Sequence, residues 1–219
     1  MIRAVLFDLD GTVADTFPAV QEALNMMRTD FGCPPLTREE TMTFFCGSEQ
    51  DFGRLSIPPE LSKDPLNREK AIRLYCDHYA ETFMHTRVCF PGITDAMERL
   101  RKHCILGLYS NKQDKYVIPL AKQLFRPGLL TIARGIRPDA PPKPDAAGTR
   151  IVLEEIGAAP DECAFVGDSE IDLLTALNAG LLPVIACWGY RGEAFMRAQG
   201  AKHLMRTPNE MADFILSLV

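Results

Sequence analysis

Three short apolar runs in this chain each stop abruptly at a polar or acidic cluster. The runs and the residues that follow them are AVLF at 4–7 before Asp8, ILGLY at 105–109 before Ser110, and AFV at 164–166 before Gly167 and Asp168. Weaker apolar runs lie at 132–133 and 184–186, and amphipathic helical patterns separate the runs. Short apolar runs with polar ends are typical of strands buried in a parallel sheet. The alternation of strands and helices therefore predicts an α/β fold built on a Rossmann-like parallel sheet.

Between residues 16 and 88 this alternation breaks down. The stretch has no convincing strand but carries two apolar stripes at helical spacing, Val20, Ala23, Leu24, Met27 and Phe31, then Ile72, Tyr75, Cys76, Tyr79 and Phe83. Such a stretch is far longer than the 2–6 residues of an ordinary connection between strand and helix, although its helices could also belong to the layer that covers the sheet. We expect a helical domain at 16–88, with a loop at 56–67, inserted into an α/β core formed by 1–15 and 89–219.

The composition excludes several kinds of partner. The 219 residues have a net charge of −5 and no basic run that would neutralise a nucleic-acid backbone. No apolar stretch is long enough to span a membrane or to form the core of a signal peptide. The seven cysteines are odd in number and include no C-x-x-C pair, which favours reduced thiols. We expect a cytoplasmic protein, monomeric or homodimeric, that binds neither nucleic acid nor a membrane.

Polar residues gather where the expected strands end. Ligands of parallel sheets bind at the edge formed by the carboxyl ends of the strands. That edge is expected to carry Asp8, Asp10, Ser110, Asn111, Asp168 and Asp172. Four carboxylates in one place require a cation, and oxygen ligands without a His or Cys cluster favour Mg²⁺ over zinc. Because Mg²⁺ bound by few carboxylates keeps positions open for phosphate oxygens, this set predicts phosphoryl chemistry.

Four motifs stand in order along the chain, each at an expected strand end or helix start. They are Asp8-Leu9-Asp10-Gly11-Thr12, Ser110-Asn111, Lys143 within Pro142-Lys143-Pro144-Asp145, and Gly167-Asp168-Ser169-Glu170-Ile171-Asp172. The set resembles the motifs of the haloacid dehalogenase-like (HAD) hydrolases over nearly the whole chain. The insert at 16–88 looks like the cap domain of that family, and the phosphoglycolate phosphatase-like branch is the most similar.

The resemblance implies a role in catalysis for five residues. Asp8 would be the nucleophile that attacks phosphorus and forms an aspartyl-phosphate. Asp10 would protonate the leaving alkoxide and then deprotonate the attacking water. Ser110 and the backbone of Asn111 would hold phosphoryl oxygens, while Lys143 would neutralise charge on Asp8 and the phosphate.

The resemblance also implies a Mg²⁺ site. Asp8, the backbone carbonyl of Asp10 and Asp168 would bind the ion. Asp172 would complete the site, either by binding the ion directly or by orienting the residues that do.

Each of these assignments has a structural alternative. Asp10 could be a turn residue before Gly11, and Ser110 with Asn111 could cap a helix. Lys143 could be a solvated charge in a proline-rich loop. Asp172 could serve only the dipole of a first helical turn.

A small phosphorylated metabolite is the expected substrate. The resemblance favours a phosphomonoester such as phosphoglycolate, with inorganic pyrophosphate or a sugar phosphate as alternatives. A phosphomutase is disfavoured because residues 15–20 lack the histidine of the β-phosphoglucomutase branch. The second acid, Asp10, argues against the dehalogenase branch. In the insert, Gly47-Ser48 could bring a loop close to the substrate, and Arg54 could hold a substrate carboxylate.

A phosphoacceptor signalling module is the competing interpretation outside enzymes. Such modules also combine an acidic Mg²⁺ cluster, an acceptor aspartate, a hydroxyl residue and a lysine. The insert and the second carboxylate at Asp10 favour turnover over storage of phosphate.

Overall fold

A computed structural model describes residues 1–43 and 55–219. The chain divides into two compact units, one formed by Met1–Asp15 and Arg87–Val219 and the other by Thr16–Thr86. The division lies after Thr86, where the sequence places it after Val88. Gly47, Ser48 and Arg54 lie outside the described residues.

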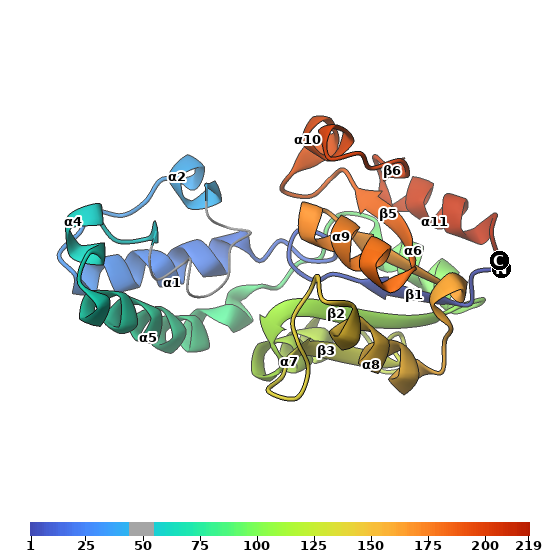
Figure 1. Cartoon of the computed structure of the whole chain (residues 1–219), viewed down its shortest axis with the longest axis horizontal. Helices are drawn as coiled ribbons and strands as arrows, with labels where there is room; N and C mark the ends of the chain where they lie inside the picture. Colours follow the sequence, from blue (N-terminus) through green and yellow to red (C-terminus); the bar gives the residue numbers. More distant parts are fainter. Residues whose placement is uncertain (44–54) are drawn as a thin grey trace. The chain divides into compact units, whose positions relative to one another are not determined.

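A parallel sheet forms the centre of the first unit (Figure 1). Its strands are β1 (Ala4–Phe7), β2 (Ile105–Gln113), β3 (Ile132–Ile136), β4 (Cys163–Gly167), β5 (Leu182–Ala186) and β6 (Leu204–Met205). The strand order is β3-β2-β1-β4-β5-β6, and every neighbouring pair is parallel. The expected α/β fold with a Rossmann-like parallel sheet is thereby confirmed.

The central strand β1 is apolar throughout because it is buried throughout. Its last residue, Phe7, is level with Leu108 of β2 on one side and Val166 of β4 on the other. The strand order turns back at β1 and β4, and ligands of such sheets bind at this reversal. The residues that follow these strands therefore reach a single edge of the sheet.

Helices cover the sheet on both faces. They are α6 (Ile93–Arg101), α7 (Asp114–Leu124), α8 (Ala146–Ile156), α9 (Glu170–Ala179), α10 (Gly192–Ala198) and α11 (Pro208–Leu216), with a short 3₁₀ turn, η2, at Pro160–Glu162. Leu6 and Phe165 of the sheet pack with Val152 of α8 and Ala176 of α9 in one buried cluster. Because crossovers are right-handed and the order reverses at β1, α6 and α7 cover the opposite face. Helix α11 packs against α6.

Strand β2 is longer than its apolar run. The sequence places its end at Tyr109, but the extended backbone continues through Gln113, and α7 begins only at Asp114. The pairing of β2 with β3 shifts register between Tyr109 and Gln113. The last four residues are polar and so do not continue the apolar pattern, although Ser110 is buried and the other three are half-buried.

The second unit is helical. It consists of α1 (Phe17–Asp30), α2 (Arg38–Met42), α4 (Pro59–Ser62), α5 (Pro65–Thr82) and the 3₁₀ turn η1 (Phe83–His85). Helices α1 and α5 pack together along the expected stripes, which bury Val20, Leu24 and Met27 of α1 and Tyr75 and Tyr79 of α5.

The loop expected at 56–67 is wrong in part. It contains α4 and the first turn of α5, which Asp64 caps by accepting a hydrogen bond from the backbone N–H of Leu66. Proline is favoured in a first helical turn, so Pro59 and Pro65 mark helix starts here instead of a loop.

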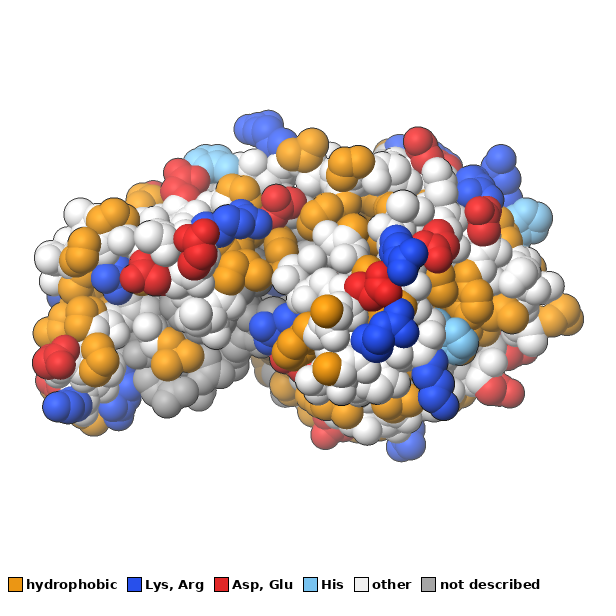
Figure 2. Space-filling view, turned by 90° about the horizontal axis from the view of Figure 1, so that it is seen from above, with side chains coloured by type: hydrophobic (Ala, Val, Ile, Leu, Met, Phe, Trp, Pro, Cys, Tyr) orange, Lys and Arg blue, Asp and Glu red, His pale blue; other side chains and the backbone are white. Residues whose placement is uncertain are grey.

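Two surface properties bear on partners. Acidic and basic side chains are interspersed over the face shown in Figure 2, without the broad basic area that nucleic-acid binding requires. Among the described residues, no helix has the length and apolar character needed to cross a bilayer.

Candidate active site

Three carboxylates meet at the edge where β1 and β4 end. Asp8 follows β1, Asp168 follows β4, and Asp172 lies in the first turn of α9. All three residues are buried, and one carboxylate oxygen from each lies within 4.8 Å of the others. The sheet order therefore brings together acidic residues that are as far as 164 positions apart in the chain.

Lys143 reaches this cluster from the connection between β3 and α8. Its Nζ lies 2.9 Å from Oδ1 of Asp8 and donates a hydrogen bond to Oδ1 of Asp172 at 2.7 Å. Burial alone would lower the pKa of Lys143, but the charges of Asp172 and Asp8 outweigh it and raise the pKa. The lysine is thus a buried cation and not a solvated charge in a loop.

Asn111 holds the backbone of Lys143 in place. Its Nδ2 donates to the carbonyl oxygen of Lys143 at 2.9 Å, and its Oδ1 accepts from the N–H of Lys143 at 2.8 Å. The neighbouring Ser110 is buried, and its Oγ accepts a hydrogen bond from the N–H of Lys112. Both residues lie in the extended end of β2, so the alternative of a helix cap does not describe them.

Burial and crowding raise the pKa of the carboxyls in this cluster. Burial raises the pKa of Asp8 to about 7, and the charges of Asp172 and Asp10 add to the effect, while Lys143 opposes it. The pKa of Asp168 also lies well above its ordinary value because of burial and the charges of Asp172 and Asp8. A metal ion fits this set, because a divalent cation would offset the repulsion that one lysine does not.

Asp172 has both carboxylate oxygens engaged. Oδ1 accepts from Lys143, and Oδ2 accepts from the backbone N–H and the Oγ of Ser169 at 3.0 and 2.7 Å. Ser169 and Asp172 together form the capping box of α9. Asp172 therefore fixes both the helix start and the lysine, an arrangement that suits an orienting role.

Asp168 is held by Thr12 of the first motif and by Tyr190, a residue that the sequence did not point to. Its Oδ1 accepts from the hydroxyl of Thr12 at 3.0 Å, and its Oδ2 accepts from the N–H of Tyr190 at 2.8 Å. The indole N–H of Trp188 donates to the carbonyl oxygen of Thr12. Trp188 and Tyr190 follow β5, whose apolar run at 184–186 is weak. The same position after a strand end is the signal in the sequence that could have identified them.

Two glycines let the backbone approach Asp168 closely. Gly11 has a φ of +80°, which favours glycine, and a Cβ there would lie 2.5 Å from Oδ2 of Asp168. A Cβ on Gly189 would overlap the side chain of Asp168. The turn after β1 and the loop after β5 therefore enclose this carboxylate on two sides.

Asp10 is more exposed than the three carboxylates of the buried cluster. Its Oδ1 is 2.8 Å from Nζ of Lys112, with 22% and 10% of the two side chains exposed. Asp8 and Asp10 thus face two different lysines, and the more accessible pair is Asp10 with Lys112. Lys112 was not singled out from the sequence, because its strand was expected to end three residues earlier.

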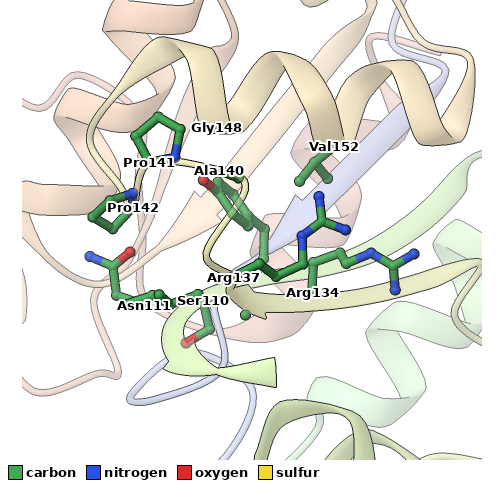
Figure 3. A pocket seen from close by; sticks show the side chains of 12 residues that line it. Ser110, Asn111, Arg134, Arg137, Ala140, Pro141, Pro142, Gly148 and Val152 are labelled. Carbon is green, nitrogen blue, oxygen red and sulfur yellow. The ribbon is translucent and has the colours of Figure 1, made fainter. Parts of the chain in front are cut away.

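A pocket adjoins Ser110 and Asn111 (Figure 3). Arg134 and Arg137 of the β3 side line it, and both form ion pairs with Glu155 of α8. None of the aspartates of the cluster lines this pocket. It is therefore a separate feature beside the carboxylates.

Comparison with known proteins places the chain among hydrolases. The profile of the haloacid dehalogenase-like hydrolases matches residues 5–186. A phosphoglycolate phosphatase of Pseudomonas putida is 32% identical over 192 residues, which cover 86% of this chain and 70% of the relative. One of Chromobacterium violaceum is 31% identical over 193 residues, which cover 86% of each chain. A solved haloacid dehalogenase-like hydrolase of Streptococcus pneumoniae has a TM-score of 0.87 over 98% of both chains at 22% identity, a likeness of fold.

Proposed function

This chain belongs to the haloacid dehalogenase-like hydrolases, and from that membership we propose that it is a phosphatase acting on a small phosphomonoester such as phosphoglycolate. The observation that carries the proposal is the position of Asp8. Its carboxylate is buried, lies 2.9 Å from the Lys143 ammonium and belongs to the three-aspartate cluster. The names of the relatives from Pseudomonas putida and Chromobacterium violaceum support the substrate.

In the first step, a carboxylate oxygen of Asp8 attacks phosphorus and the bond between phosphorus and the ester oxygen breaks. Asp10 supplies the proton that the leaving alkoxide needs. Ser110, the Asn111 backbone and Lys143 hold the phosphoryl oxygens as negative charge shifts among them. The protein is left with an aspartyl-phosphate at Asp8.

In the second step, water attacks phosphorus and the bond to Asp8 breaks. Asp10, now ionised, takes a proton from the water, so both aspartates return to their starting state and inorganic phosphate leaves. The accessible position of Asp10 supports this double role, since the residue must meet first the leaving group and then water.

The metal site proposed here is for Mg²⁺. Asp8, Asp168 and the Asp10 carbonyl would bind the ion, and Asp172 would orient Lys143 and the start of α9. When bound, Mg²⁺ supplies positive charge that keeps the acidic cluster ionised and offsets the charge of the phosphoryl oxygens. All-oxygen donors and the family's use of a divalent metal support this choice.

The test is phosphate release by the purified full chain. We expect many turnovers per protein with Mg²⁺ and a kcat/KM for phosphoglycolate that exceeds those for other small phosphomonoesters, sugar phosphates and pyrophosphate. Acid quenching during turnover of ³²P-labelled substrate should trap label on the protein, and Asp8→Asn should trap none.

Other outcomes would redirect the proposal. Release of a single equivalent of phosphate would indicate a phosphoacceptor module instead of an enzyme. A higher kcat/KM for pyrophosphate or for a sugar phosphate would replace phosphoglycolate as substrate while leaving the phosphatase chemistry in place.

A further inference from the structure

A second lysine stands beside the site, and the chemistry described so far does not use it. Lys112 Nζ lies 2.8 Å from Oδ1 of Asp10, and only 10% of its side chain is exposed. Lysine usually extends its ammonium into water, so a lysine drawn inward over a carboxylate needs a reason.

The backbone directs Lys112 to this place. Strand β2 remains extended through Gln113, and its pairing with β3 shifts register between Tyr109 and Gln113. The backbone N–H of Lys112 donates a hydrogen bond to Oγ of Ser110, whose hydroxyl is assigned to the phosphoryl group. This bond fixes the backbone of Lys112 next to Ser110.

The two lysines lie at opposite ends of the reacting ester, Lys143 at the phosphoryl group and Lys112 at the leaving group. Lys143 is almost fully buried between Asp8 and Asp172, where phosphorus is attacked. Lys112 is beside Asp10, the residue that protonates the leaving oxygen under the proposed function. Two successive hydrogen-bond lengths place its ammonium within about 6 Å of that oxygen.

From this geometry we infer that Lys112 binds a carboxylate on the leaving group and thereby selects phosphorylated 2-hydroxy acids over phosphate esters of neutral alcohols. In such acids a single carbon separates the ester oxygen from the carboxylate carbon, so a group next to Asp10 meets the carboxylate. The inference rests on the proposed function, because it takes the position of the leaving group from Asp10.

The test compares two esters of nearly equal size, 2-phosphoglycolate and its neutral amide, 2-phosphoglycolamide. The full-length protein should prefer the carboxylate, as measured by the ratio of the two kcat/KM values. Lys112→Met should lower that ratio by roughly ten- to a hundredfold, the size of one lost charge-assisted hydrogen bond. Lys112→Arg should retain most of the preference, because it keeps the charge.

A matched control lies three residues further along. Lys115 is exposed and packs its ammonium over the ring of Tyr116. Lys115→Met removes the same charge from the same segment and should leave the ratio unchanged. Circular dichroism checks that each variant is folded.

Product inhibition of the unmodified protein provides a measurement that needs no variant. Glycolate should compete with substrate at least tenfold more tightly than glycolamide, because only glycolate offers Lys112 a carboxylate.

The outcomes separate this inference from the proposed function. The role of Lys112 would be overturned if Lys112→Met lowered kcat/KM for both esters equally, so that their ratio stayed within twofold of the parent's. Equal inhibition by glycolate and glycolamide would overturn it too. Either result would leave the proposed phosphatase activity in place. Failure of the unmodified protein to hydrolyse any phosphomonoester would instead overturn the proposed function.

Discussion

The two compact units of this chain differ in where their described ion pairs lie. In the unit formed by Met1–Asp15 and Arg87–Val219, Asp8, Lys143 and Asp172 form buried ion pairs, while other pairs, such as Arg99 with Asp213, lie exposed at the surface. In Thr16–Thr86, His78 pairs with Asp30, and His85 with Glu22, at partly exposed positions. Arg28 of this second unit is buried and donates hydrogen bonds to the carbonyl oxygens of Pro34 and Ser56.

The difference shows where the molecule accepts an energetic cost. Removing carboxylates from water and crowding them costs several kcal/mol, so such a cluster persists only where the surrounding fold supports it. The sheet unit supports one at the end of its central strands. The helical unit packs α1 against α5 along apolar stripes, and its exposed ion pairs contribute little to its stability.

The comparison predicts its largest effect for Asp8→Asn. The amide keeps the shape of the side chain but removes the nucleophile, so kcat should fall by about a thousandfold or more. The matched control is Asp30→Asn in α1, which makes the same chemical change at an exposed ion pair and should leave kcat within twofold. If Asp8→Asn retained a tenth of the parent's kcat, Asp8 could not be the nucleophile.

Removal of divalent metal should have the next largest effect. Without a cation, the Asp8 cluster repels a phosphate dianion, and we expect chelator to lower kcat/KM by at least about a hundredfold, with recovery on adding excess Mg²⁺. Phosphate release followed during a Mg²⁺ titration measures this. Undiminished turnover in excess chelator would show that the site works without a metal ion.

The raised pKa of Asp8 predicts a pH-dependent cost in stability for the metal-free protein. Its carboxyl titrates near 3.8 when unfolded and near 7 when folded, so the folded state binds the extra proton between these values and loses stability as pH rises through them. Asp8→Asn removes that loss. The variant should match the parent near pH 4 and exceed it by roughly 4 kcal/mol above pH 7.

Urea unfolding of both proteins in chelator, at several pH values, checks this expectation. Added Mg²⁺ should reduce the difference in free energy of unfolding between the variant and the parent, because it stabilises the parent. A difference in stability that stays constant from pH 4 to pH 8 would show that Asp8 ionises normally in the fold.

Replacing residues 16–88 by a short linker tests whether substrate choice lies in the helical unit. The residues assigned to the chemistry all remain, so weak, Mg²⁺-dependent hydrolysis of an activated aryl phosphate should persist. The preference among natural phosphomonoesters, beyond the selection for a carboxylate assigned to Lys112, should fall by about tenfold or more, because a domain that excludes water and checks the substrate is gone. A folded linker variant with the parent's ranking of kcat/KM values would place specificity in the sheet unit.

The smallest expected effect belongs to the surface pairs of the helical unit. Asp30→Asn removes the partner of His78 and should lower the free energy of unfolding by less than about 1 kcal/mol, as for other exposed pairs. Thermal unfolding measures the change. A loss of several kcal/mol would show that this unit also depends on its charges.

Much of the sheet could be predicted from local sequence. A strand buried on both faces must be apolar throughout, so AVLF at β1 and AFV within β4 are visible without any tertiary information. The edge at which Asp8 and Asp168 meet follows from the rule that parallel strands end together. The end of β2 could not be read in this way, because Ser110–Gln113 is extended but consists of polar residues.

The sequence by itself determined which residues stand at strand ends, because burial and strand periodicity act over a few neighbours. Only the tertiary structure decided their partners. Lys143 meets Asp8 across 135 positions, and Tyr190 meets Asp168 through a loop after β5. Lys112 at the end of β2 meets Asp10, which follows β1, although the two residues are 102 positions apart in the chain. Charges interact through space and not along the chain, so pairing and the resulting pKa values exist only once the sheet has brought the strand ends together.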